Sequence, residues 1–166
     1  DAAKTEENLY RLTVPTGAGK TLSSLRFALH HAKEKKKQHI FYVAPFNAIL
    51  EQNAEEIRKA TGNPEIVLEH HCNVVCEEGE EEKYRSLTET WDVPIIVTTA
   101  VQMLNTLFSD KKSSIRRMHT LCNSIIIFDE VQAIPVRCME LFHLAVNFLS
   151  KFCNTTIILC SATQPS

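Results

Sequence analysis

Short apolar runs alternate along the chain with longer segments in which apolar residues recur every three or four positions. Short apolar runs bounded by polar residues or glycine are typical of buried strands, and the longer spacing is typical of helices that bury one face. Strands are predicted at 9–14, 39–44, 66–69, 93–98, 124–128 and 156–160. Helices are predicted at 21–37, 47–61, 113–121 and 135–152, with a further helix from the end of the strand at 93–98 to about residue 108.

This alternation predicts the α/β fold class, with a mainly parallel sheet and helices on both faces. The sequence has no internal repeat and no long low-complexity linker, and its 166 residues are enough to bury a core, so a single domain is expected. Ligands of such sheets bind beyond the carboxyl ends of the strands.

Local chemistry marks the ends of the predicted helices. The first helix ends in a run of basic residues at 33–37, which suits the negative end of a helix dipole and indicates a solvated helix end rather than a nucleic-acid site. Asn47 is predicted to cap the second helix and Gly62 to end it. The acidic stretch at 77–82 is expected to form a mobile surface loop that leads into a helix.

Composition is ordinary for a globular domain, with 44% hydrophobic and 23% charged residues. The net charge of −2 gives no global attraction to nucleic acid or membrane, so any nucleic-acid contact must come from a local surface. No apolar run has the length of a membrane span, and residues 1–8 are polar, so neither membrane association nor a secretory signal is expected. Several of the six cysteines lie in apolar patterns, which favours a reduced, cytoplasmic protein.

The segment after the first strand has the layout of a phosphate-binding loop. A turn with glycines leads from the strand to a helix that Lys20 and Thr21 open. Backbone N–H groups of such a turn surround an anion, Lys20 is predicted to contact the β- and γ-phosphates, and the Thr21 hydroxyl is predicted to ligate Mg²⁺. The predicted nucleotide-binding residues are Thr16, Gly17, Ala18, Gly19, Lys20 and Thr21.

The match to the phosphate-loop pattern is incomplete, because Val14 stands where G-x-x-x-x-G-K-[ST] has its first glycine. A glycine-rich turn before a helix is common by itself. The Gly19-Lys20-Thr21 string directly after a strand is what indicates a nucleotide.

A second motif is the apolar strand that ends in Asp129 and Glu130. Downstream of a phosphate loop, such an acid pair indicates hydrolysis of a nucleoside triphosphate. Asp129 is predicted to hold the Mg²⁺ that Thr21 also contacts, and Glu130 to orient and polarise the attacking water. The predicted catalytic residues are therefore Lys20, Asp129 and Glu130.

A third motif, Ser161-Ala162-Thr163, follows the last strand. Its two hydroxyls can hydrogen-bond the carboxylates of Asp129 and Glu130, but serine and threonine are also common where a strand passes into a loop. The tripeptide alone says little about function, and it becomes informative because it follows the first two motifs in order.

In this order the three motifs resemble motifs I, II and III of superfamily 2 helicases. The residues that carry the resemblance are 15–21, 129–132 and 161–163. Further strings, at 12–25, 51–54, 69–73, 97–102 and 161–165, are similar to those of the CRISPR-associated helicase–nucleases of type I interference. The resemblance covers nearly the whole chain.

The resemblance implies a RecA-like P-loop NTPase domain that uses ATP and Mg²⁺ to move along single-stranded DNA in antiviral defence. It also implies a CRISPR RNA-guided surveillance complex and a second RecA-like lobe as partners. The implied nucleic-acid residues are Pro45, Phe46, Asn47, Thr98, Thr99 and Gln102, although Thr98 and Thr99 also suit a simple strand end. Gln132, Ser161 and Thr163 are implied to couple hydrolysis to movement.

Residues 1–166 are interpreted as the first lobe of a longer protein. The second lobe with its arginine finger and the His-Asp-rich nuclease domain of the family have no counterpart in the sequence, so weak binding and poor turnover are expected of the lobe alone. Ala18 replaces a glycine that the family often has, and its small side chain should preserve phosphate binding.

Two further clusters are ambiguous. His70, His71, Cys72 and Cys76 are residue types that bind Zn²⁺, but no second Cys/His pair with suitable spacing follows, which disfavours zinc. A basic cluster suits a solvated helix face and a contact with the DNA backbone equally well; it consists of Lys111, Lys112, Arg116 and Arg117.

The same residues bear on other possible functions. A GTPase should show Asn-Lys-x-Asp and a transporter ATPase Ser-Gly-Gly, and the sequence contains neither. A decayed site is disfavoured because Lys20, Thr21, Asp129 and Glu130 are all present. The alternatives that stay open are another superfamily 2 motor, such as an RNA helicase or a repair translocase, and a nucleotide-binding module that is inactive in isolation.

Overall fold

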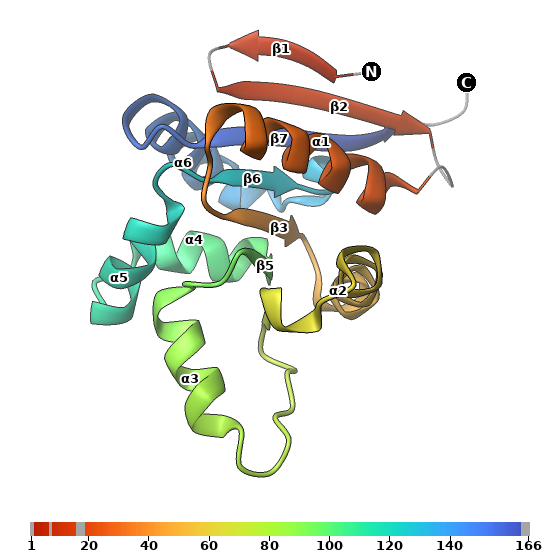
Figure 1. The fold of residues 1–166 in the computed structure, drawn as a ribbon. Helices are drawn as coiled ribbons and strands as arrows, with labels where there is room; N and C mark the ends of the chain where they lie inside the picture. Colours follow the sequence, from red (N-terminus) through yellow and green to blue (C-terminus); the bar gives the residue numbers. More distant parts are fainter. Residues whose placement is uncertain (1, 7, 16–18, 164–166) are drawn as a thin grey trace.

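A seven-stranded sheet organises the fold (Figure 1). The structure is a computed structural model that describes residues 2–6, 8–15 and 19–163. The strand order is β1-β2-β7-β6-β3-β5-β4, with β1 antiparallel to β2 and every other pair parallel. The strands are β1 (Ala2–Glu6), β2 (Leu9–Pro15), β3 (Ile40–Ala44), β4 (Val67–His70), β5 (Ile95–Thr99), β6 (Ile125–Phe128) and β7 (Thr156–Thr163).

Six α-helices in the described residues cover the two faces of this sheet (Figure 1). They are α1 (Lys20–Lys35), α2 (Asn47–Thr61), α3 (Glu81–Thr90), α4 (Ala100–Phe108), α5 (Lys112–Leu121) and α6 (Met139–Phe152). Short 3₁₀ turns lie at Pro64–Ile66, Val131–Ala133 and Val136–Cys138. None of the described helices is both long enough and apolar enough to cross a lipid bilayer.

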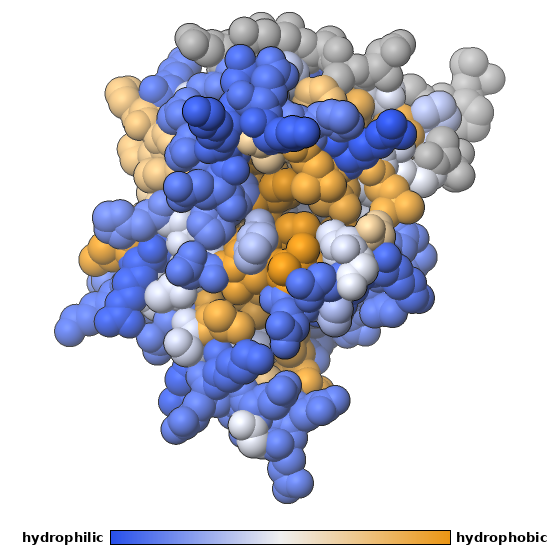
Figure 2. Space-filling model, in the orientation of Figure 1, coloured by the Kyte–Doolittle hydropathy of each residue, from blue (hydrophilic) through white to orange (hydrophobic). Residues whose placement is uncertain are grey.

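Two hydrophobic cores lie on opposite faces of the sheet because successive strand residues point to opposite sides. In β3, Tyr42 belongs to the core beneath α1 and α2, whereas Phe41 and Val43 belong to the core beneath α4 and α6. Figure 2 shows the molecule from the side of α1. Apolar side chains gather over the strands below α1, and polar side chains cover the outer surface of this helix. The predicted fold class, a mainly parallel α/β sheet with helices on both faces, is confirmed.

Most predicted elements occur within one to four residues of their expected bounds, and the differences have physical causes. The strand β1 was not predicted because residues 2–6 are mostly polar, which an edge strand with one partner tolerates. The expected Asn47 cap is wrong: Phe46 is the N-cap, and Asn47 begins α2 and donates to the Cys72 Sγ atom over 3.0 Å. A 3₁₀ turn after Pro135 delays the start of α6 to Met139.

The parallel register gathers the carboxyl ends of the central strands at one edge of the sheet. Pro15 pairs with Thr163, Phe128 with Leu159, and Ala44 with Thr99. Residues that follow these strands are therefore brought together, although they are far apart in the sequence.

A buried aromatic cluster joins β4 to the end of α3. Trp91 is fully buried, its Nε1 donates to the His70 Nδ1 atom over 2.9 Å, and the guanidinium of Arg117 lies 4.8 Å from its ring. Burial, followed by the positive charge of Arg117, lowers the pKa of His70 to about 4. His70 is therefore neutral in the folded protein and serves as an acceptor.

This cluster predicts a specific loss of stability in acid. The unfolded state takes up a proton on His70 below about pH 6.5, whereas the folded state resists protonation down to about pH 4. The contribution of His70 is fully present above pH 6.5 and should fall by up to about 1.4 kcal/mol for each pH unit below it. Urea unfolding across this range should show the loss.

The control is His70→Gln, which keeps an acceptor for Trp91 but does not titrate in this range. Its free energy of unfolding should depend less steeply on pH than that of the wild type. Parallel pH profiles for the two proteins would contradict the assignment of His70 as a buried neutral acceptor.

Candidate active site

The site lies where β2 passes into α1, facing the end of β6. Gly19 precedes α1 with φ of 66°, a left-handed conformation that side chains rarely adopt, which explains a glycine at this position. Thr16, Gly17 and Ala18, which were also predicted to bind the nucleotide, lie outside the described residues. Lys20 and Thr21 form the first turn of the helix.

The Lys20 ammonium sits between the two predicted catalytic acids. Its Nζ lies 2.8 Å from Asp129 Oδ1 and also contacts Glu130 Oε1. The side chains of Lys20 and Asp129 are only 18% and 5% exposed, so water screens this pair weakly. The structure thus brings together the three predicted catalytic residues, although Lys20 and Glu130 are 110 positions apart in the sequence.

Tyr42 holds the Asp129 carboxylate from inside the sheet. Its hydroxyl donates to Asp129 Oδ2 over 2.6 Å, and the backbone N–H of Glu130 donates to Oδ1 over 2.9 Å. Burial, followed by the negative charge of Asp129, raises the pKa of Tyr42 far above its usual range, so the hydroxyl keeps its proton and acts as the donor. Asp129 therefore has a fixed orientation.

Thr21 shares this buried network with Asn53 of α2. The Thr21 hydroxyl donates to Asn53 Oδ1 over 3.2 Å and lies beside the Tyr42 hydroxyl. Because the Thr21 hydrogen is directed to a protein acceptor, a lone pair of its oxygen is left for a cation. Asn53 Nδ2 is buried and has no hydrogen-bond partner among the described residues.

Glu130 stands on a strained backbone. Its φ and ψ of 48° and 49° place a residue with a side chain in the left-handed region, which costs on the order of 1 kcal/mol or more. Gln132 Nε2 donates to Glu130 Oε2, while Oε1 contacts Lys20. Such strain persists where the surroundings determine the side-chain position, and here the Glu130 carboxylate is held by Lys20 and Gln132.

The donor set fits a magnesium nucleotide. Thr21 and Asp129 offer hard oxygen ligands that both lie beside the Tyr42 hydroxyl, and Mg²⁺ prefers such ligands. Lys20 supplies a positive charge for a phosphate group. In the structure this charge is balanced by Asp129 and Glu130, so a bound anion would compete with them for Lys20.

The predicted coupling residues Gln132 and Ser161 line one cavity of about 360 Å³ beside the site. Within the described residues, Ser161 makes no hydrogen bond to either carboxylate, and nothing is described of the Thr163 side chain. The coupling role of these residues stays a prediction. The side-chain donors found on the acid pair are instead Tyr42, Lys20 and Gln132.

The predicted nucleic-acid residues lie at the ends of β3 and β5. Phe46 is exposed, and Pro45, Asn47 and Gln102 are partly exposed. Thr98 is fully buried and donates to the His70 carbonyl over 2.8 Å, so its hydroxyl is already used within the fold. Thr99 caps α4 by accepting from the Gln102 N–H over 3.1 Å, which accounts for a threonine there without nucleic acid.

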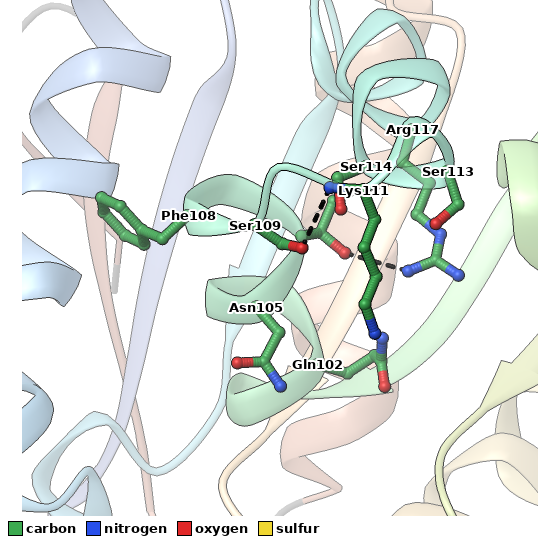
Figure 3. Close-up of a pocket in the computed structure, with 9 residues that line it drawn as sticks. Gln102, Asn105, Phe108, Ser109, Lys111, Ser113, Ser114 and Arg117 are labelled. Atoms are coloured by element: carbon green, nitrogen blue, oxygen red, sulfur yellow. Dashed lines mark hydrogen bonds between the residues drawn. The ribbon is translucent and has the colours of Figure 1, made fainter.

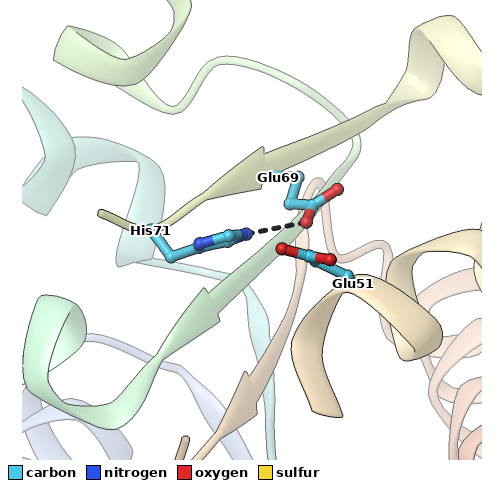
Figure 4. A group of neighbouring side chains, drawn as sticks. All are labelled: Glu51, Glu69 and His71. Carbon is cyan, nitrogen blue, oxygen red and sulfur yellow. Dashed lines mark hydrogen bonds and ion pairs between the residues drawn. The ribbon is translucent and has the colours of Figure 1, made fainter. Parts of the chain in front are cut away.

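The histidines that raised the question of zinc serve separate hydrogen-bond networks. Glu51, Glu69 and His71 bring potential ligand atoms within 4.8 Å of one another (Figure 4). However, His71 Nδ1 accepts from the Asn73 N–H, so Nε2 carries the proton and donates to Glu69 over 2.7 Å. Arg58 also pairs with Glu69 at 3.0 Å. Protein donors therefore already occupy the ligand atoms of Glu69 and His71.

The sequence profile of the DEAD/DEAH box helicase family matches residues 2–166. The chain is 25% identical over 178 residues to the CRISPR-associated nuclease/helicase Cas3 of Haloferax volcanii, with 93% of this chain and 19% of that protein aligned. It thus spans about a fifth of the length of this curated relative.

Several solved structures share the fold of this chain and are 20% identical to it in sequence. The crystal structure of T. fusca Cas3 gives a TM-score of 0.78, and its ATP complex 0.74, each aligned over 93% of this chain and 18% of the other. A CRISPR RNA-guided surveillance complex before nicking contains a chain that matches with a TM-score of 0.65, over 94% of this chain and 16% of that one.

The sequence did not identify Tyr42 and Asn53 as residues of the site. The hydrogen bond between Tyr42 and Asp129 leads to a prediction about stability. Tyr42→Phe removes a buried donor to a carboxylate and should lower the free energy of unfolding by about 1–3 kcal/mol. Tyr10→Phe is the matched control, because the Tyr10 hydroxyl has no hydrogen-bond partner among the described residues. Its effect should stay within about 0.5 kcal/mol in urea unfolding. Equal losses of stability in the two variants would contradict a stabilising hydrogen bond from Tyr42 to Asp129.

Proposed function

The chain belongs to the DEAD/DEAH box helicase family, and we propose that it is the first RecA-like, ATP-hydrolysing lobe of a CRISPR type I interference helicase that acts on single-stranded DNA. The observation that carries this proposal is the convergence of Lys20, Asp129 and Glu130 at one edge of the sheet. The family match and the similarity to Cas3 support it.

Each residue of the site has a distinct role in this proposal. Lys20 binds the terminal phosphates of ATP and, in doing so, leaves the acid pair. Thr21 and Asp129 hold Mg²⁺, which neutralises charge on the phosphates when it is bound. Glu130, released from Lys20 and still held by Gln132, accepts a hydrogen bond from the attacking water.

Nucleic acid is proposed to bind along the ends of β3 and β5. Phe46 offers an exposed aromatic face for stacking, and Pro45, Asn47, Thr99 and Gln102 lie beside the same edge. Contacts with backbone and sugar suit movement that does not depend on base sequence. The proposed partners are single-stranded DNA, a CRISPR RNA-guided surveillance complex and a second RecA-like lobe, in the cytoplasm.

The proposed catalytic role of Glu130 is tested by Glu130→Gln in the intact protein. Loss of the carboxylate should lower ATP hydrolysis by about 10²- to 10⁴-fold, because the water loses its acceptor. Binding of a fluorescent ATP analogue with Mg²⁺ should persist. Glu78→Gln, at an exposed loop acid, should hydrolyse ATP like the wild type. Normal turnover by Glu130→Gln would refute the assignment.

The nucleic-acid proposal predicts that single-stranded DNA stimulates ATP hydrolysis by the intact protein. The rate should be measured with single-stranded DNA, duplex DNA and single-stranded RNA at equal nucleotide concentration. Stimulation by RNA alone would favour the RNA-helicase alternative, and stimulation by duplex DNA alone would favour a repair translocase. Equal rates of ATP hydrolysis with and without nucleic acid would contradict the proposed motor function.

A further inference from the structure

The basic cluster at the start of α5 divides into residues with different surroundings. Arg117 is half-buried: its Nε donates to the Thr88 carbonyl over 2.6 Å, an Nη donates to Thr106 over 3.2 Å, and its guanidinium covers Trp91. Arg116 pairs with Glu89 at 3.0 Å. Both arginines are therefore engaged within the fold.

Lys111 differs from them, because no described residue pairs with its ammonium. It borders a pocket of about 440 Å³ between α4 and α5 (Figure 3). In Figure 3 the Lys111 side chain extends along α4 toward Gln102, which lines the same pocket. The other lining residues are Asn105, Thr106, Phe108, Ser109, Ser113, Ser114 and Arg117.

The chemistry of this lining suits an anion. No aspartate or glutamate is among the described residues that line the pocket, whereas hydroxyls, amides and two cations are. The Arg117 guanidinium lines the pocket, and its hydrogen bonds to Thr88 and Thr106 fix the position of its positive charge. Lys111 adds a second positive charge from an exposed position.

The pocket is also continuous with the proposed path of the nucleic acid. Gln102 lies in the first turn of α4, where its N–H donates to Thr99 at the end of β5. A strand that passes Thr99 and Gln102 would place its next phosphates near Lys111.

We propose that the α4–α5 pocket is a binding subsite for a backbone phosphate of the nucleic-acid strand, with the Lys111 ammonium as its cation. This inference rests on the proposed function and extends the contact surface beyond the ends of the strands. It assigns Lys111 to binding and leaves the neighbouring Lys112, which does not line the pocket, outside it. A lone inorganic phosphate offers the same chemistry but lacks the neighbouring contacts of a strand.

The experiment compares Lys111→Ala and Lys112→Ala in the intact protein, since both remove one positive charge from adjacent positions. The measurement is the anisotropy of a labelled oligothymidine titrated at several salt concentrations. Loss of one phosphate contact should reduce the slope of log K against log salt by about 0.7 for a single strand. Lys111→Ala should show this change with weaker binding, whereas Lys112→Ala should keep the wild-type slope.

Further variants separate the possible outcomes. Lys111→Arg should restore the slope, and ATP hydrolysis without DNA should be unchanged in all three variants. Equal slopes for Lys111→Ala and Lys112→Ala would overturn the subsite, as would competition by millimolar inorganic phosphate that Lys111→Ala abolishes without any change in DNA affinity. If the wild type binds no single-stranded DNA, the proposed function itself fails, and the subsite fails with it.

Discussion

Parallel pairing of β2 with β7, and of β7 with β6, is the constraint on which the site depends. Because β7 lies between them, the loop after β2 and the acids after β6 open at the same edge of the sheet. A shift of β7 by one residue would reverse which of its side chains face each core. Ile157 and Ile158 of β7 are fully buried in the two opposite cores, so such a shift would disturb the packing of both. The core therefore sets the distance between Lys20 and Asp129.

Within that edge the charges balance one another before any ligand arrives. Two adjacent carboxylates in a largely buried position would repel each other, and the Lys20 ammonium relieves this repulsion. The same ammonium is the group that a phosphate would attract. Binding would therefore exchange one set of ion pairs for another, and the hydrogen bond from Tyr42 keeps Asp129 in place during the exchange.

Much of the fold could be predicted because its strands are short apolar runs and its helices have a buried stripe. The acid pair and the Gly-Lys-Thr string were visible for the same reason: each is local in the sequence. Tyr42 was not visible, because a tyrosine in an apolar strand resembles an ordinary core residue, and its partner Asp129 lies 87 positions away. Asn53 was hidden in a helical pattern in the same way. The hydrogen bond that occupies the Thr98 hydroxyl depends on its pairing with His70 of β4, which no pattern within β5 reveals.

The position of β7 also has a consequence for how the protein is made. The strand β2 enters the parallel sheet only by pairing with β7, from Leu9 with Ile157 to Pro15 with Thr163. During synthesis, the residues that lead into the phosphate loop leave the ribosome long before this partner exists. The strands β3, β5 and β6 can pair with one another earlier, because all of them precede β7. Closing the site is thus a late step in folding, and a chain arrested before β7 would hold the acids on an open sheet edge without the lysine opposite them.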